Sequence, residues 1–217
     1  MKLLYLNPNS SVHMTDGIVA VARQALPEAE ILGWTNHGAP PAIQGPEDGA
    51  AAIPGLLAQL PAAREAGADA IVIACFDDVG LDQMRVASHC PVLGIGQSAF
   101  ATATLLGLRY SVITTLAVSV PVIEGNIRAS GYDTLCRGVR PSGLPVLTVE
   151  AGGEEVCQRL ADEMRQARDH DQAQAAILGC AGMAGLKAEL ARRTTLQVID
   201  GVEASARLAA ALAQMAV

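Results

Sequence analysis

Two of the five cysteines stand at equivalent positions of an internal repeat. The segment Ala68–Leu81, ADAIVIACFDDVGL, matches the segment Ala173–Leu186, AQAAILGCAGMAGL, when each residue is paired with the one 105 positions later. Five of these positions are identical, and they include the pair Cys75 and Cys180. A repeat of this length predicts two similar halves that each carry one thiol.

A matched pair of thiols suits a reaction that removes a proton from one face of a carbon and returns a proton to the other face. One group must act as a thiolate base and the other as a thiol acid, which is the chemistry of a two-base racemase or epimerase. Local charges can move the pKa of a cysteine from about 8.5 toward the working pH. Free N–H groups at the following helix starts would favour the thiolate. Asp77 and Asp78 would oppose it, unless the helix start uses them as N-caps.

Short β-rich runs alternate with Ala- and Leu-rich helical stretches along the chain. The predicted strands are almost continuously apolar, as expected for parallel sheets covered on both faces. They are Leu3–Asn7, Glu30–Trp34, Ala70–Cys75, Val92–Ile95, Tyr110–Thr114, Leu135–Val139, Ala175–Gly179 and Leu196–Ile199. Helical spacing is found over Thr15–Leu26, Gly49–Ala66, Ala99–Leu106, Val118–Ser130, Glu154–Arg168, Leu186–Arg193 and Glu203–Met215.

The predicted fold class is therefore α/β, with two pseudo-symmetric four-stranded parallel-sheet domains that carry helices on both faces. The repeat offset also pairs Gly96 with Gly201, just after a strand in each half. Ligands of open α/β sheets bind at the carboxyl ends of the strands. Cys75 and Cys180 both lie at such ends, so we expect the active site in a cleft between the two domains.

Composition and charge exclude several classes of function. The chain has 217 residues, of which 51% are hydrophobic, and a formal net charge of −7. A negative charge without a basic run argues against nucleic acid as a partner. Charged residues interrupt the most apolar stretch, so no membrane span is expected. An odd number of cysteines without a CxxC motif and a start too short for a secretory signal favour a cytoplasmic protein with reduced thiols.

Other chemistry-bearing residues show no strong pattern. The histidines lack metal-ligand spacing, and we predict no metal site; they are His13, His37, His89 and His170. The pair Gly94-x-Gly96 is too short a motif to indicate nucleotide binding, and we expect no cofactor. Three cysteines have no repeat partner and are interpreted as small buried side chains; they are Cys90, Cys136 and Cys157.

Polar loops follow the first strand of each predicted half. The segment Asn7–Ser11, NPNSS, follows the first of these strands, and Thr114 and Thr115 end the other. Their amide and hydroxyl groups could hold carbonyl oxygens or ring N–H groups of a substrate. The same residue types are also ordinary turn formers and helix caps, and the sequence leaves both roles open.

The sequence resembles the aspartate/glutamate racemase superfamily, and within it the hydantoin racemase branch. The resemblance covers most of the chain and is carried by LNPNSS, GPEDGAAAIPGL, ACFDDVGL, VLGIGQSA, VITTLAVSVPVIEGNI and LGCAGMAGL. It implies a cofactor-independent racemase in which Cys75 and Cys180 form the acid/base pair. It also implies discontinuous domains, with residues 1–96 plus 203–217 in the first and 97–202 in the second, and assembly as a homo-oligomer.

The residues after the two thiols bear on the substrate. In similar amino-acid racemases a hydroxyl residue suited to a carboxylate follows each cysteine, whereas here Phe76 and Ala181 stand there. We therefore expect a small neutral cyclic substrate, such as a 5-substituted hydantoin or allantoin. The residues predicted to bind it are Asn7, Phe76, Asp77, Gly80, Thr114, Thr115, Ala181 and Gly182.

Other functions remain open at this point. Allantoin racemase shares the chemistry and the fold, and an amino-acid racemase or a cis–trans isomerase with one nucleophilic thiol would keep similar halves. Related decarboxylases retain one of the two cysteines, so the presence of both argues against them. A non-catalytic small-ligand-binding protein would also have two α/β halves around a cleft.

Overall fold

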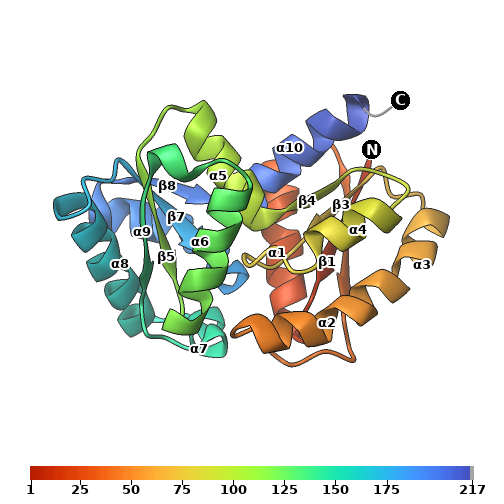
Figure 1. The fold of residues 1–217 in the computed structure, drawn as a ribbon, viewed down its shortest axis with the longest axis horizontal. Coiled ribbons are helices and arrows are strands. Elements are labelled where there is room, and N and C mark those ends of the chain that lie inside the picture. The colour runs from red at the N-terminus through yellow and green to blue at the C-terminus, as the bar shows by residue number, and fades with distance from the viewer. Residues whose placement is uncertain (216–217) are drawn as a thin grey trace.

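Two parallel four-stranded sheets form the centre of the computed structural model, which describes residues 1–215 (Figure 1). The strand order is β2-β1-β3-β4 in the first sheet and β6-β5-β7-β8 in the second, so the two halves have the same topology. This architecture confirms the predicted fold class. The strands are β1 (Lys2–Asn7), β2 (Glu30–Thr35), β3 (Ala70–Ile73), β4 (Val92–Gly94), β5 (Tyr110–Thr114), β6 (Cys136–Pro141), β7 (Ala175–Gly179) and β8 (Gln197–Asp200).

Helices cover both faces of each sheet. They are α1 (Val12–Ala25), α2 (Pro46–Ala58), α3 (Leu60–Glu65), α4 (Leu81–Ala87), α5 (Ile95–Leu105), α6 (Val120–Ala129), α7 (Val146–Ala151), α8 (Glu154–Asp169), α9 (Lys187–Thr194) and α10 (Gly201–Met215). Three short 3₁₀ turns, Ala117–Ser119, Asp133–Leu135 and Ala181–Met183, lie in the second half. None of the helices within residues 1–215 is long and apolar enough to cross a membrane.

Several elements begin or end a few residues away from the prediction, as where α5 begins at Ile95 rather than Ala99, and two differences are larger. The helix expected over Gly49–Ala66 is two helices, α2 and α3, which meet at Gln59. Pro61 explains the interruption, because it has no N–H to donate and its ring clashes with the preceding turn of a continuous helix. In addition, α4 and α7 were not predicted; they contain only seven and six residues, too few for a helical period to be recognised.

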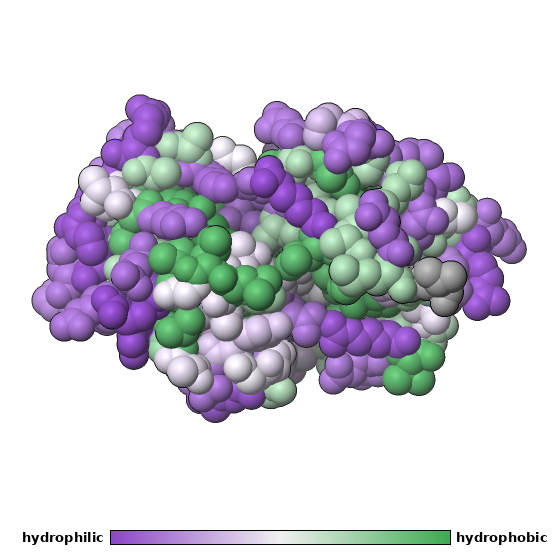
Figure 2. Space-filling model, turned by 90° about the horizontal axis from the view of Figure 1, so that it is seen from above, coloured by the Kyte–Doolittle hydropathy of each residue, from purple (hydrophilic) through white to green (hydrophobic). Residues whose placement is uncertain are grey.

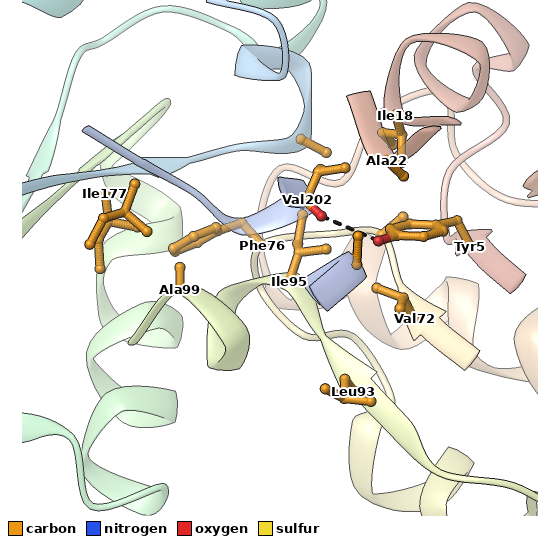
Figure 3. Packing of buried hydrophobic residues seen from close by; sticks show 14 of the residues in the cluster. Tyr5, Ile18, Ala22, Val72, Phe76, Leu93, Ile95, Ala99, Ile177 and Val202 are labelled. Carbon is orange, nitrogen blue, oxygen red and sulfur yellow. Dashed lines mark hydrogen bonds between the residues drawn. The ribbon is translucent and has the colours of Figure 1, made fainter. Parts of the chain in front are cut away.

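A central apolar cluster joins the two halves. Side chains along β1 alternate between two sets of helices: Tyr5 faces the central cluster, whereas Leu4 and Leu6 face α2 and α3. The aromatic rings of Phe76 and Phe100 meet edge to face in this cluster, with centroids 5.4 Å apart. Figure 3 shows Phe76 between residues of both halves and the Tyr5 hydroxyl donating to the carbonyl of Val202. One continuous apolar cluster therefore packs the two halves against each other.

The helices α5 and α10 lie where the halves meet. In Figure 1, α10 crosses above the junction and ends near the N-terminus. It packs against α5 and also against α1 and β3 of the first half. The assignment of 203–217 to the first domain, and the boundaries at 96 and 202, stay predictions; Ala216 and Val217 lie outside the described residues.

Apolar surface is exposed near the same helices. Figure 2, seen from above, shows apolar residues across the middle of the molecule and polar residues toward its two ends. The exposed large apolar residues at the end of α5 and along α10 are Leu105, Leu106, Leu212 and Met215. Apolar surface of this kind often marks contact sites, while the expected homo-oligomer stays a prediction.

We expect Phe100→Ala to lower the free energy of unfolding by about 3–5 kcal/mol, because it leaves a cavity in the cluster that joins the halves. Phe100 is fully buried, whereas Leu105 on the same helix is 79% exposed. The control Leu105→Ala should therefore change stability by no more than about 0.5 kcal/mol. Urea unfolding of the two variants measures both values, and equal losses would contradict this description of the core.

Candidate active site

Cys75 and Cys180 line one small cavity between the two halves. Cys75 follows β3 and Cys180 follows β7, so each thiol lies at the carboxyl end of an inner strand. The volume of the cavity is about 20 Å³, which is the space of about one water molecule. Five other predicted site residues line the same cavity, and they are Phe76, Asp77, Thr114, Thr115 and Ala181.

Three predicted site residues lie outside the lining of this cavity. Asn7 is buried, and its amide nitrogen donates to the side-chain oxygen of Asn9 (2.8 Å) and to the hydroxyl of Thr15 (3.0 Å). Gly80 has a φ of 68° and precedes α4, away from the thiols. The N–H of Gly182 donates to the Cys180 sulfur at 3.4 Å. Asn7 and Gly182 therefore form hydrogen bonds with two residues that line the cavity, Asn9 and Cys180.

Close backbone packing sets the position of Cys180. A Cβ added at the preceding residue, Gly179, would lie 2.7 Å from the carbonyl oxygen of Ile113 on the neighbouring strand. The hydroxyl of Thr114 donates to the carbonyl of Gly179 at 3.1 Å. Because this hydroxyl proton is already used, Thr114 offers the cavity a hydrogen-bond acceptor.

Burial dominates the electrostatics of both thiols. It raises the pKa of Cys75 well above its usual value, and the charges of Asp77 and Cys180 raise that pKa further. Burial likewise raises the pKa of Cys180 to about 12, against the lowering effect of hydrogen bonds from the N–H groups of Gly182 and Met183. The N–H groups expected to favour the thiolates are present, but desolvation outweighs them.

The two carboxyl groups after Cys75 have different surroundings. Asp77 lines the cavity and accepts a long hydrogen bond from the hydroxyl of Ser119 at 3.5 Å; burial raises its pKa to about 6. Asp78 points away from the cavity lining and accepts the N–H groups of Gly96 and Gln97, while burial raises its pKa to about 7. Asp78 thus caps α5 and not the helix that directly follows Cys75.

Several cavity residues were not predicted, because they come from loops and helices outside the repeat. Asn9 and Met14 come from the segment after β1, and Ile43 precedes α2. Ser119 and Val146 complete the wall from the second half. The position of Asn9 in the polar NPNSS loop could have indicated a role in the site. The apolar residues Met14, Ile43 and Val146 have no comparable feature in the sequence.

Polar side-chain contacts also join the two halves. The carboxylate of Glu150 accepts the Ser11 hydroxyl at 2.9 Å and lies 3.1 Å from a ring nitrogen of His13. The side-chain oxygen of Gln44 accepts the N–H of Val146 at 3.1 Å. Residues 1–215 contain no group of three or more His, Cys, Asp or Glu side chains that could hold a metal ion.

Comparisons with known proteins agree with this architecture. The sequence model described as Asp/Glu/Hydantoin racemase matches residues 3–209. A hydantoin racemase of Rhizobium meliloti is 40% identical over 98% of this chain and 88% of its own. The solved allantoin racemases of Klebsiella pneumoniae and Pseudomonas fluorescens have TM-scores of 0.94 and 0.95 and identities of 34% and 31%. Both cover 100% of this chain, which covers 89% and 92% of theirs.

Two α/β halves of equal topology, with a cysteine at the same strand end of each, define a class of pseudo-symmetric enzymes with one shared cavity. The chain belongs to the Asp/Glu/hydantoin racemase family, and it is an isomerase of the racemase type. The resemblance inferred from the sequence and the predicted enzyme class are thereby confirmed.

Proposed function

We propose that this protein racemises 5-substituted hydantoins by proton transfer between the ring C5 and the two thiols, Cys75 and Cys180, without a cofactor. The observation that carries the proposal is that one thiol from each half lines the same cavity. A base and an acid on two walls of one site are what inversion at a carbon requires.

Removal and return of the C5 proton would use the two thiols in turn. The thiolate sulfur of one cysteine takes the C5 proton, and the electron pair of the C–H bond moves onto the neighbouring ring carbonyl as an enolate. The thiol of the other cysteine then gives its proton to the opposite face of C5, and the enolate collapses. Each turnover exchanges which sulfur is charged. Because the charge of Cys180 raises the pKa of Cys75, the pair favours one thiolate at a time.

The cavity supports a neutral substrate rather than a carboxylate. Phe76 and Ala181, next to the thiols, offer no side-chain donor for a carboxylate. The carboxyl group of Asp77 would repel a negative charge and can accept a ring N–H. Thr114 can accept a second N–H. A hydantoin ring carries two N–H groups, and this set of acceptors suits it.

Substrate entry requires the two halves to separate slightly. A cavity of about 20 Å³ is too small for a five-membered ring. The contacts of Glu150 with Ser11 and of Gln44 with Val146 cross between the halves, and we infer that they break when the ring enters.

Allantoin is the second candidate substrate. The solved structures reported above are of allantoin racemases, and their TM-scores exceed 0.9. Allantoin is a hydantoin with a ureido group on C5, so the same thiols and acceptors would serve it.

A substrate panel tests the proposal. Optical rotation is followed for an enantiopure 5-alkylhydantoin, enantiopure allantoin and L-glutamate, with the uncatalysed rate subtracted. We expect racemisation of the alkylhydantoin, and of allantoin where the ureido group is accepted, but none of glutamate. Racemisation of glutamate alone would overturn the proposed substrate class, and racemisation of allantoin alone would replace hydantoin by the second candidate.

We expect Thr114→Val to raise KM or lower kcat/KM by about fivefold to tenfold, the effect of losing one hydrogen bond to the substrate. Asn7→Ala should act in the same direction through the displaced side chain of Asn9. Thr102→Val is the matched control, since that hydroxyl donates to the carbonyl of Ser98 within α5. The measurement is the steady-state kinetics of the three variants. Unchanged kcat and KM in both Thr114→Val and Asn7→Ala would contradict the proposed roles of Thr114 and Asn7 in substrate binding.

A further inference from the structure

The side chain of Asp78 connects the loop that carries Cys75 to the start of α5, the helix that follows the neighbouring strand β4. The carboxylate of Asp78 accepts the N–H of Gly96 at 2.9 Å and the N–H of Gln97 at 2.7 Å. Both donors belong to the first turn of α5, whose own N-cap residue, Gly94, has no side chain to cap it. Asp78 therefore supplies the acceptors for this helix start from 18 residues away.

The two glycines at the start of α5 make room for this attachment. A Cβ at Gly94 would collide with the carboxylate of Asp78, and a Cβ at Gly96 would lie 2.4 Å from the carbonyl oxygen of Phe76. The absence of side chains at Gly94 and Gly96 thus leaves the space that the loop after Cys75 occupies. Only residues without a side chain fit at these two positions while the loop stays in place.

Within residues 1–215, the second half shows no equivalent of this attachment. Its pseudo-equivalent helix, α10, is capped by Asp200, the residue directly before it, whose carboxylate accepts the N–H of Val202 at 2.7 Å. In the repeat, the position of Asp78 is taken by Met183 in the loop after Cys180. In the described residues, the loop after Cys75 is therefore hydrogen-bonded through a side chain to the start of α5, whereas the loop after Cys180 has no such bond to the start of α10.

We propose that Asp78 is a positioning residue that holds Cys75, and not Cys180, in register with the substrate carbon. The inference rests on the proposed function. The backbone couples the two residues directly, because the N–H of Asp78 donates to the carbonyl of Cys75 at 3.0 Å. Asp78 also adopts a φ of 49°, in the left-handed region, so the turn depends on its anchored side chain. A displacement of a reacting group by about 1 Å lowers a rate by about 10²-fold.

Overall racemisation cannot reveal which thiol is displaced, since two enantiomers have equal free energies and kcat/KM must be equal in both directions. Single-cysteine variants separate the thiols. In D₂O, Cys180→Ser leaves Cys75 to exchange the C5 proton of one enantiomer, and Cys75→Ser leaves Cys180 to exchange that of the other.

The test adds Asp78→Asn to each single-cysteine variant and follows deuterium at C5 by NMR. Asparagine keeps only one acceptor oxygen, so one of the two bonds to α5 is lost. We expect the exchange by Cys75 to fall about tenfold or more, and the exchange by Cys180 to change less than about twofold. Asp200→Asn is the control for neutralising a buried carboxylate at the equivalent helix start. One oxygen, Oδ1, accepts the N–H groups of both Val202 and Glu203, and asparagine keeps that acceptor without touching the Cys75 loop. Gly96→Ala, which pushes the same loop at Phe76, should reproduce the selective loss if Asp78→Asn does not fold.

A second measurement needs no substrate. Mass spectrometry follows alkylation of both thiols by iodoacetamide, and we expect Asp78→Asn, but not Asp200→Asn, to raise the rate at Cys75 relative to Cys180. Equal changes at both thiols, or no change, would overturn the positioning role. Absence of C5 exchange in the wild-type protein would instead contradict the proposed function, and alkylation would still decide the role of Asp78.

Discussion

Replacing either Cys75 or Cys180 by serine is expected to lower kcat/KM for racemisation by about 10³-fold or more. Inversion in either direction needs one group to remove the proton and the other to return it, and general acid–base groups of this kind contribute about 10²–10⁴-fold each. A serine hydroxyl has a much higher pKa than a thiol, so it supplies almost no base. The measurement is the initial change of optical rotation with an enantiopure 5-alkylhydantoin.

The matched control for these variants is Cys90→Ser. Cys90 is also a free cysteine of the first half, but it does not line the cavity. The interpretation of Cys90 and Cys136 as buried side chains was wrong, since both are partly exposed and only Cys157 of the three is buried. Cys90→Ser should keep nearly full activity, which would show that serine in place of a cysteine is tolerated elsewhere. Activity within tenfold of wild type in either Cys75→Ser or Cys180→Ser would contradict the two-thiol mechanism.

The second large effect is on the pH dependence. Burial raises the pKa of Cys75 and raises that of Cys180 to about 12. Near neutral pH the thiolate is therefore the minor form. As long as the pH stays below the pKa, each rise of one pH unit increases the thiolate fraction about tenfold. We expect kcat/KM to rise by about tenfold per unit from pH 7 to pH 9, once the uncatalysed rate is subtracted.

Asp77 should shift this profile. Its charge raises the pKa of both thiols, so Asp77→Asn removes an opposing charge and is expected to move the rising limb to lower pH. Asp82→Asn, at a 95% exposed carboxylate, is the control and should leave the limb in place. A flat profile between pH 7 and pH 9, or a limb that Asp77→Asn does not move, would contradict the electrostatic description of the thiols.

The strands and the sheet type were predictable because their signals are local. Along β1 every residue after Lys2 is buried, and successive side chains such as Leu4 and Tyr5 enter different apolar clusters. A strand buried on both faces must be almost continuously apolar, and this pattern is visible without coordinates. Proline was a weaker signal for the division of one predicted helix: α3 starts around Pro61, whereas Pro54 lies inside α2 without ending it.

The positions of individual polar side chains depended on contacts that no spacing reveals. Asn7 was predicted to bind substrate, and in the structure its amide nitrogen donates to Asn9 in the same loop and to Thr15 in α1. Asp78 was weighed as a cap for the helix after Cys75, yet its partners lie on α5, much later in the chain. Such choices are made by tertiary packing, whereas the equivalence of the two cysteines follows from the repeat alone.

Early deuterium content in D₂O tests the two-thiol account most directly. An enantiopure 5-alkylhydantoin is incubated with the protein, the reaction is stopped at low conversion, and deuterium at C5 is measured separately in the two enantiomers. With a separate base and acid, the donating thiol carries solvent deuterium, so the inverted enantiomer should be deuterated while the recovered starting enantiomer keeps its proton. Inverted product that retains protium, or equal deuterium in both enantiomers from the first time points, would contradict proton transfer by Cys75 and Cys180 from two sides of the substrate.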